Sequence, residues 1–200
     1  MRHGATAWNA AGRFQGQSDV ELSPEGRAQA RATSQHLSPE RIDAIFASDL
    51  ARALETARIV AEPHGVAVTA DPRLREFDFG TWEGLTWAEI TATRPELRDL
   101  GATAAQRYRP EGGESFADVA ARVRAFVDEV TAGNRGHIVV VTHAGPLHAM
   151  LDVLGVFAEG DAGESLRRRF LPGSVTRVAM DAGTARLITL SDVRHLDPTG

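Results

Sequence analysis

The sequence predicts an α/β fold of three layers, with helices on both faces of a mainly parallel central sheet and an antiparallel edge. Short apolar runs alternate with helical stretches along the chain, which is the pattern of βα units. The run "HIVVVTHAG" (137–145) is typical of a strand buried on both faces. Two β-type segments joined by "DAGT" (181–184) predict a closing hairpin, which supplies the antiparallel edge.

Start and stop signals delimit the elements of the first half. Ser23 suits a helix N-cap and Pro24 the first helical position. Asp49 suits the N-terminus of the second helix, and Gly65 its end. The expected elements are a helix over 22–37, a strand over 41–48, a helix over 48–65 and a strand over 66–70.

The second half follows the same rules. Thr86 and Glu89 have the spacing of a capping box, and Pro95 ends the helix that they open. A longer amphipathic helix follows, on which Arg122 and Arg124 are expected to point outward. The expected elements are a helix over 86–94, an irregular region over 97–113, a helix over 115–133, the buried strand, a helix over 146–155, and hairpin strands over 174–180 and 185–190.

Composition limits the class of protein. Two hundred residues without repeats or linkers predict a single domain over 1–200. A net charge of −5 argues against nucleic-acid binding, and the absence of cysteine excludes disulfides and thiolate catalysis. No apolar run reaches the roughly 20 residues of a membrane helix. We therefore expect a cytoplasmic protein with no nucleic-acid or membrane partner.

All 22 basic residues are arginine. The absence of lysine excludes Schiff-base chemistry and the lysine-bearing phosphate loop. The planar fork of arginine suits phosphate and carboxylate groups.

Polar residues gather where the predicted strands end and helices begin. Sites in α/β sheets lie at such strand ends. Arginine forks and helix N-termini together favour an anion, and a phosphoryl group is the natural one. A neutral imidazole among arginines could act as a nucleophile, and a carboxylate could protonate a leaving alkoxide. The residues concerned are Arg2, His3, Asn9, Arg52, Glu76 and His143.

Four segments carry a family resemblance. They are "RHGATAWN", "SDLARALETA", "LREFDFGTWEG" and "VVVTHAGPLHAM", in this order. In order and approximate spacing they resemble the signature segments of the histidine phosphatase superfamily, the phosphoglycerate-mutase-like proteins. The resemblance runs from Arg2 to about residue 150 and implies that family's αβα fold.

The resemblance also implies a role for each site residue. His3 would be the nucleophile that forms a phosphohistidine, and Glu76 the proton donor and later the base. Arg2, Arg52 and His143 would hold the phosphoryl oxygens, with help from Asn9. No metal and no cofactor are expected. Positioning and charge neutralisation are most of what phosphoryl transfer requires of a protein.

Taken singly, three of these residues have simpler interpretations. Arg52 could form a surface ion pair with Glu55 or Glu62, Glu76 could be an exposed loop acid, and His143 a core histidine. Their joint occurrence in the four segments favours the catalytic interpretation. The remaining histidines and the tryptophans are expected to be structural: His36, His64, His137, His148, His195, Trp8, Trp82 and Trp87.

Two further segments bear on the pocket. "RYRPEGGESF" (107–116) could form a movable loop over it, with Gly112 and Gly113 as hinges. "LRRRF" (166–170) is expected to be a solvated turn or helix edge.

The expected function is metal-independent hydrolysis of a small phosphorylated metabolite. Sugar phosphates, phosphoglycerate derivatives and α-ribazole phosphate are candidate substrates. A phosphoglycerate-mutase-type activity is the alternative, although the family's mutases have a longer basic insertion after the acid-bearing loop. A non-catalytic phospho-ligand-binding relative and a metal-dependent hydrolase are the other classes, and a homodimer is one possible assembly.

The opening residues differ from the family pattern. In the family, the Arg-His-Gly triplet follows an apolar strand of some five or six residues, whereas here Met1 alone precedes Arg2. We expect that Met1 is not the natural start, or that it replaces an apolar residue, and that the first strand is missing from the printed sequence.

Overall fold

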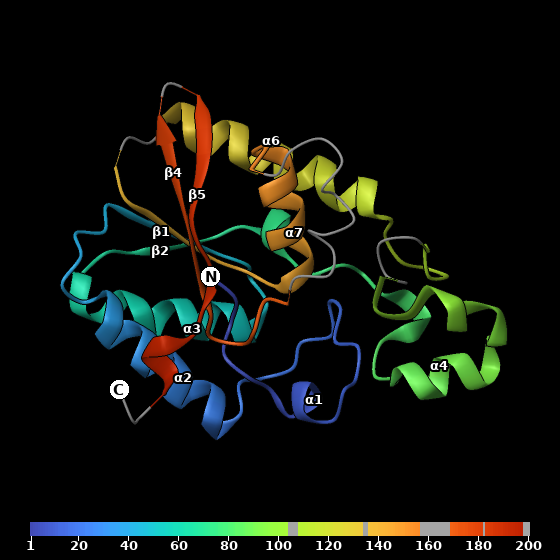
Figure 1. Cartoon of the computed structure of the whole chain (residues 1–200). Coiled ribbons are helices and arrows are strands. Elements are labelled where there is room, and N and C mark those ends of the chain that lie inside the picture. The colour runs from blue at the N-terminus through green and yellow to red at the C-terminus, as the bar shows by residue number, and fades with distance from the viewer. Residues whose placement is uncertain (104–107, 134–135, 157–168, 182, 198–200) are drawn as a thin grey trace.

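A parallel three-stranded sheet forms the middle layer of the fold (Figure 1). The computed structural model describes residues 1–103, 108–133, 136–156, 169–181 and 183–197. The strands are β1 (Ala44–Ala47), β2 (Val68–Ala70) and β3 (Ile138–Val141), in the order β2-β1-β3. Ile45 of β1 pairs with Val68 on one side and with Val139 on the other. Parallel pairing places the carboxyl ends of all three strands at one edge of the sheet.

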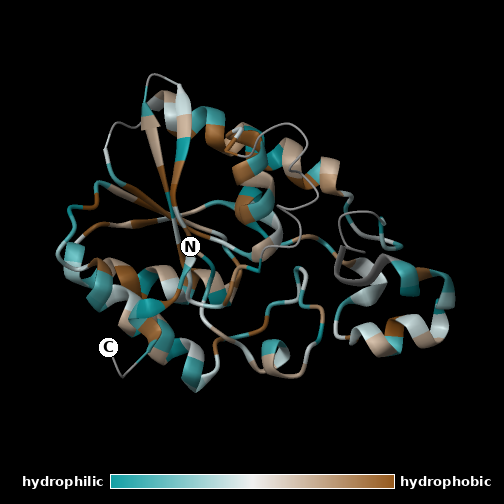
Figure 2. Cartoon of the chain, viewed as in Figure 1, coloured by the Kyte–Doolittle hydropathy of each residue, from teal (hydrophilic) through white to brown (hydrophobic). Residues whose placement is uncertain are grey.

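Helices cover both faces of this sheet. Helices α2 (Pro24–Leu37) and α3 (Ala51–Ala61) lie on one face, and α6 (Phe116–Gly133) and α7 (Ala144–Val153) on the other (Figure 1). Ile45 packs into the first of these cores, whereas its neighbour Phe46 packs into the second. Figure 2 accordingly shows hydrophobic strands between helices of mixed hydropathy. The predicted three-layer α/β fold is confirmed.

A hairpin forms the antiparallel part of the fold. It consists of β4 (Val175–Asp181) and β5 (Thr184–Asp192). The first residues of the chain lie between β3 and β4 and join the two sheets. Thr142 N donates to Met1 O over 3.0 Å, and Arg2 N donates to Ser174 O over 3.1 Å. His3 is therefore fixed at the edge where β3 ends.

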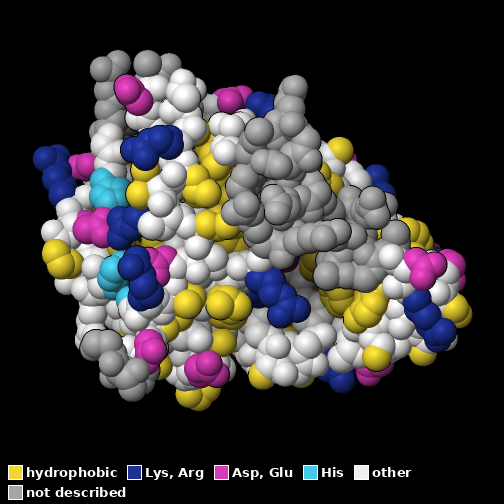
Figure 3. Space-filling view, viewed as in Figure 1, with side chains coloured by type: hydrophobic (Ala, Val, Ile, Leu, Met, Phe, Trp, Pro, Cys, Tyr) yellow, Lys and Arg dark blue, Asp and Glu magenta, His cyan; other side chains and the backbone are white. Residues whose placement is uncertain are grey.

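An apolar groove of ≈ 570 Å³ lies between β3 and the hairpin, lined in part by Met1, Val140 and Val175. Met180 and Ile188, which are 47% and 45% exposed, stand on the hairpin side of it. Figure 3 shows hydrophobic side chains gathered beside the hairpin. None of the six predicted site residues lines this groove, so it is separate from the candidate site.

Most of the predicted start and stop signals are confirmed. The Ser23 side chain accepts a hydrogen bond from Gly26 N, and Thr86 forms the capping box with Glu89. Gly65 has a φ of 63° and ends the segment after α3. The assignment of Asp49 to the start of α3 is wrong in detail: Leu50 is the N-cap, and the Asp49 carboxylate forms an ion pair with Arg75 instead.

The first turn of α3 is capped from a distant segment. Ala51 N donates to Asp19 Oδ1 over 2.7 Å. Helix α7 begins at Ala144, two residues before the predicted start, and His143 is its N-cap residue. Both helix N-termini therefore lie at the edge of the sheet where the strands end.

The expectation that Arg122 points outward is wrong, whereas Arg124 is exposed as expected. The Arg122 side chain is 17% exposed and forms an ion pair with Glu114, with Nε 2.9 Å from Oε1. The period of the helix alone could not reveal this, because the polar partner comes from outside the helix.

Short helices complete the described part of the chain. Trp82, Trp87 and Tyr108 pack together beside them, with the ring centroids of the stacked Trp82 and Tyr108 5.4 Å apart. The short helices are α1 (Ala7–Ala10), η1 (Glu62–His64), η2 (Pro72–Leu74), η3 (Gly80–Trp82), α4 (Trp87–Thr93), η4 (Pro95–Thr103) and η5 (Arg194–Leu196).

No helix of the described residues is long and apolar enough to cross a membrane.

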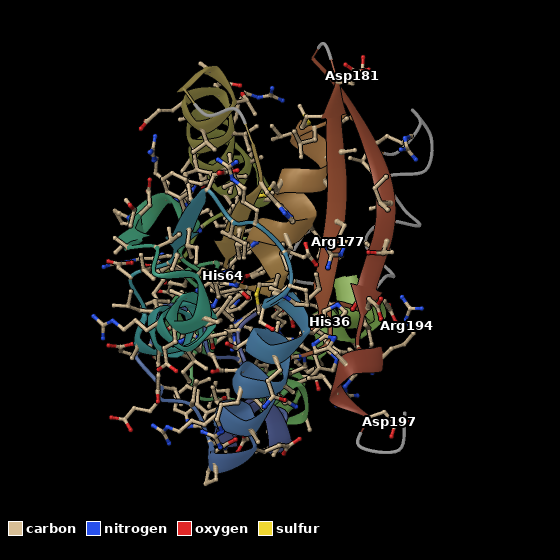
Figure 4. All side chains as sticks on the ribbon, turned by 90° about the vertical axis from the view of Figure 1, so that its left-hand side faces the viewer. His36, His64, Arg177, Asp181, Arg194 and Asp197 are labelled. Atoms are coloured by element: carbon tan, nitrogen blue, oxygen red, sulfur yellow. The ribbon has the colours of Figure 1, made fainter. Side chains whose placement is uncertain are left out.

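A histidine pair fastens the C-terminal turn to α2. The rings of His36 and His195 stack with centroids 4.9 Å apart, and Thr33 Oγ1 lies 3.0 Å from His195 Nε2. Figure 4 shows His36 beside the hairpin and the turn after it, where Arg177 and Arg194 lie. Neither histidine lines the pocket that holds the predicted site residues. Both rings make packing contacts between α2 and the C-terminal turn, as expected for structural histidines.

His148 of α7 is a buried histidine whose titration should be visible in the stability of the fold. It packs edge-on against Phe170 at 4.7 Å, and its Nδ1 is buried without a hydrogen-bond partner among the described residues. Burial lowers the pKa of His148 to about 4. The unfolded chain, with an ordinary pKa of about 6.5, takes up this proton first as the pH falls.

The free energy of unfolding should therefore fall between pH 6.5 and pH 4. The share due to His148 is about 3 kcal/mol, at about 1.4 kcal/mol per unit of pKa shift. His148→Met fills a similar volume and cannot titrate. Urea unfolding of both proteins at several pH values should show a shallower acid dependence for the variant. Parallel curves would contradict the assignment.

Candidate active site

A pocket of ≈ 150 Å³ lies at the edge of the sheet where the strands end. Five of the six predicted site residues line it: Arg2, His3, Asn9, Arg52 and Glu76. They come from three separate segments of the chain, and the fold brings them together as expected.

His3 is positioned from both sides of its backbone. His3 N donates to Thr142 O over 3.0 Å, and Gly173 N donates to His3 O over 3.0 Å. The side chain is 1% exposed, and its Nδ1 lies 2.6 Å from Gly4 O. Because a carbonyl oxygen can only accept, Nδ1 carries the proton. The lone pair of the neutral ring is therefore on Nε2.

His143 lies behind His3 rather than in the lining of the pocket. Its ring centroid is 5.0 Å from that of His3, with the planes inclined at 59°. His143 is fully buried, and neither ring nitrogen has a hydrogen-bond partner among the described residues. Buried polar atoms are usually satisfied, so these two nitrogens call for a ligand or water.

Arg52 is held from the loop that precedes α2. Its guanidinium donates to Gly16 O over 2.6 Å and to Ser18 O over 2.8 Å. The residue is fully buried, and Glu55 pairs with Arg27 instead. The interpretation of Arg52 as a surface ion-pair residue is therefore wrong.

Arg2 completes the basic side of the pocket. Its Nη1 donates to Phe170 O over 2.6 Å. The Nε atoms of Arg2 and Arg52 are both buried and have no partner among the described residues. Each of the two arginines that line the pocket thus has a donor that no described residue uses.

Glu76 is 8% exposed, so the interpretation as an exposed loop acid is wrong. Its Oε1 accepts hydrogen bonds from Phe77 N and from Gly145 N, each over 3.0 Å. A Cβ atom on residue 145 would lie 2.5 Å from Oε1 and 2.2 Å from the Phe77 ring. Glycine at this position therefore allows the first turn of α7 to reach the carboxylate.

Asn9 belongs to α1 and takes part in a capping box. Its Oδ1 accepts hydrogen bonds from Thr6 N over 3.0 Å and from the Thr6 hydroxyl over 3.1 Å. The side-chain oxygen is thus committed to the cap, which leaves the amide nitrogen as the available donor.

The electrostatics of the pocket favour neutral imidazoles. Burial is the first cause that holds the pKa of His3 well below 6.5, and Arg2 and Arg52 lower it further. Burial also holds the pKa of His143 well below 6.5, with Arg52 as the next cause. Burial lowers the pKa of Arg52 to about 10, so this side chain stays charged at neutral pH. The pocket combines charged arginines with uncharged histidines.

Sequence reasoning missed five residues that line this pocket: Arg13, Phe14, Gln15, Gly16 and Phe79. Four of them follow the first signature segment after a gap of three residues, and the polar residues Arg13 and Gln15 could have been chosen on that ground. Arg13 stands at the edge of the site, 36% exposed, and pairs with Glu89.

The segment expected to cover the pocket lies elsewhere. Its described residues, 108–116, do not line the pocket, and the segment is fastened to the loop after Glu76. Thr81 N donates to Glu111 O over 3.1 Å, and Glu114 N to Asp78 O over 2.8 Å. Of "LRRRF", residues 166–168 lie outside the described residues. Arg169 is exposed, as a solvated edge requires, whereas Phe170 is buried.

Comparison with known proteins shows the family of the chain. The sequence profile of the histidine phosphatase superfamily (branch 1) matches residues 1–193. Glucosyl-3-phosphoglycerate phosphatase of Mycobacterium tuberculosis (strain ATCC 25618 / H37Rv) is 41% identical over 159 residues, which cover 75% of this chain and 71% of the relative. Phosphoserine phosphatase 1 of Hydrogenobacter thermophilus (strain DSM 6534 / IAM 12695 / TK-6) is 36% identical over 151 residues, covering 75% and 72%.

Solved structures show the same relationship. The structure of a mycobacterial glucosyl-3-phosphoglycerate phosphatase in complex with VO3 superimposes with a TM-score of 0.86 at 35% identity, covering 96% of each chain. The chain belongs to the histidine phosphatase superfamily. The resemblance inferred from the four segments, the fold and the class of enzyme, a phosphoric monoester hydrolase, are confirmed.

Proposed function

We propose that this protein hydrolyses small phosphorylated metabolites through a phosphohistidine on His3. One observation carries the proposal. Four buried nitrogens at or behind the pocket have no hydrogen-bond partner among the described residues: Arg2 Nε, Arg52 Nε, His143 Nδ1 and His143 Nε2. Three of these nitrogens can donate at once, one from each arginine and one from the neutral His143 ring, and a phosphoryl group with its acceptor oxygens and negative charge suits these donors.

The first half of the reaction forms the phosphohistidine. His3 Nε2 attacks phosphorus while the ester P–O bond breaks, and Nδ1 keeps its proton, which it donates in a hydrogen bond to Gly4 O. The leaving alkoxide takes a proton from the Glu76 carboxyl group. Arg2 and Arg52 balance the charge that the phosphoryl oxygens carry through the transition state.

The second half releases phosphate. The Glu76 carboxylate accepts a proton from water, the water oxygen attacks phosphorus, and the bond to His3 Nε2 breaks. Glu76 ends protonated and His3 neutral, so the site is ready for another ester. His143, being neutral, can donate its single N–H to a phosphoryl oxygen, and Asn9 can donate an amide N–H as well.

Relatives support small-metabolite substrates. Their names give glucosyl-3-phosphoglycerate and phosphoserine as substrates, and one related structure holds inorganic phosphate. The pocket of ≈ 150 Å³ has room for a phosphoryl group. Hydrolysis is favoured over mutase activity because, of the residues after Glu76 that the structure describes, no arginine lines the pocket.

A panel of phosphomonoesters tests the proposal, with each assay run with and without EDTA. The panel includes phosphoserine, 3-phosphoglycerate, glucosyl-3-phosphoglycerate, sugar phosphates and p-nitrophenyl phosphate, and mutase activity on 3-phosphoglycerate is assayed alongside. We expect release of phosphate that EDTA leaves unchanged. Among the described residues, no three His, Asp or Glu side chains converge as a metal site would require.

Three results would contradict the proposal. Activity abolished by EDTA and restored by a divalent metal would favour a metal-dependent hydrolase. Mutase turnover well above phosphate release would favour the mutase alternative. No turnover on any ester, with phosphate still bound, would favour a non-catalytic binding protein.

A further inference from the structure

Arg122 of α6 holds the backbone that leads to Glu76. Its Nη1 donates to Arg73 O over 2.7 Å and to Arg75 O over 2.6 Å. Its Nη2 donates to the carbonyl oxygen of Glu76 itself over 2.9 Å. One side chain thus satisfies three carbonyl groups within four consecutive residues. Arg73 belongs to η2, whereas Arg75 and Glu76 follow it in a loop, where no regular ladder fixes the backbone.

Glu114 completes this arrangement from the other side. Its carboxylate accepts hydrogen bonds from Arg122 Nε and Arg122 Nη2, each over 2.9 Å. The same carboxylate accepts a hydrogen bond from Asp78 N over 3.0 Å, and Glu114 N donates one to Asp78 O over 2.8 Å. The pair Arg122–Glu114 therefore holds the loop both before and after Glu76. With side chains 17% and 21% exposed, the pair is partly shielded from solvent.

The carboxylate of Glu76 depends on this backbone. Its Oε1 meets Gly145 N at the start of α7, in the same turn as His143. The side chain reaches this position only if the Glu76 backbone stays in place. Arg122 fixes that backbone from α6, whereas Gly145 fixes the carboxylate from α7. Because general acid catalysis requires hydrogen-bond reach, a small displacement of the loop weakens proton transfer.

We propose that Arg122, with Glu114, is a positioning residue that holds Glu76 for proton transfer to the leaving group. This inference rests on the proposed function, since it assigns Glu76 the role of the acid. Arg122 itself does not line the pocket and touches no reacting atom. Its planar fork is needed for the role, because the compact ammonium of lysine cannot serve three carbonyls and a carboxylate in this geometry.

Arg122→Lys tests the proposal because it keeps the charge and loses the fork. The assay compares an alkyl phosphate, whose leaving group needs a proton, with p-nitrophenyl phosphate, whose leaving group hardly does. We expect kcat on the alkyl ester to fall roughly 10-fold, within the ~10²-fold that a misplacement of about 1 Å can cost. On p-nitrophenyl phosphate kcat should fall much less, and KM should change little on either ester. Arg124→Lys, on the exposed side of the same helix, is the matched control and should leave both values unchanged.

A double variant separates positioning from a general loss of structure. In the background of Glu76→Gln, the acid is already lost, so Arg122→Lys should cause little further loss on the alkyl ester. Full additivity of the two losses, or an equal loss on both esters from Arg122→Lys alone, would overturn the proposal. So would unchanged kinetics in a folded variant.

Glu114→Gln is the second variant, for use if Arg122→Lys does not fold. It keeps the shape and an accepting oxygen, and we expect a smaller selective loss on the alkyl ester. An equal loss on both esters, or none, would again overturn the inference. Thermal unfolding of each variant establishes that the assays report on folded protein.

Failure of the proposed function would give different results. The wild-type protein would hydrolyse no ester, or the Glu76→Gln variant would lose activity equally on esters with good and poor leaving groups. Failure of the inference alone leaves both of these results as proposed and removes only the selective effect of Arg122.

Discussion

His3→Ala should lower kcat on p-nitrophenyl phosphate by on the order of 10⁵-fold, as removal of a covalent nucleophile does in other enzymes. The side chain is 1% exposed and its Nε2 holds the lone pair, so alanine at this position removes the attacking atom. The loss should appear with every ester, because the nucleophile is required whatever the leaving group. Steady-state kinetics measure this directly.

A histidine far from the pocket supplies the control. His137 is 44% exposed and lies near Glu40, so His137→Asn should keep the wild-type kcat. Thermal unfolding should show that His3→Ala remains folded. Denaturing quench of the wild type with labelled substrate should leave phosphate on His3, stable in alkali and released by acid. Retention of most turnover by His3→Ala, or label on another residue, would show that the nucleophile has been assigned wrongly.

Glu76→Gln should lower kcat on an alkyl phosphate by roughly 10²- to 10⁴-fold, the usual contribution of a general acid or base. The loss on p-nitrophenyl phosphate should be much smaller, because nitrophenolate leaves without a proton. The amide oxygen of glutamine can still accept the hydrogen bonds from Phe77 N and Gly145 N, so the loop should keep its place. Parallel kinetics on both esters measure the difference.

Glu62 supplies the matched control, because it is exposed at the end of α3 and lies outside the pocket lining. Glu62→Gln should behave as the wild type on both esters. Equal losses on both esters for Glu76→Gln would argue that this carboxylate binds or positions substrate rather than transferring a proton.

Sequence reasoning predicted the elements well where the determining contacts are local. Caps at Ser23 and Thr86, the turn at Gly65 and the two-sided apolar run of β3 all act within a few residues. It also selected six site residues, five of which line one pocket. Those residues belong to four segments whose order along the chain is itself a signal.

Sequence reasoning failed where partners come from distant segments. Asp49 was expected to begin α3, but Arg75 takes its carboxylate and Asp19 caps the helix instead. Arg122 was expected to face solvent, but the carbonyls of the acid-bearing loop and Glu114 turn it inward. Both errors have the same cause. A charged side chain takes the best available partner, and the helical period does not reveal a partner that the fold brings from elsewhere.

The sequence by itself determined the layers of the fold, the segments that form the site and the chemical groups available there. Hydrophobic period, caps and the four signature segments are properties of neighbouring residues, so they can be read directly from the chain. Only the tertiary structure decided how those groups are held. It placed His143 behind His3, buried Arg52 under two loop carbonyls and fixed Glu76 between α6 and α7. Orientation, burial and the resulting neutral histidines depend on packing between distant segments, which is a property of the folded chain alone.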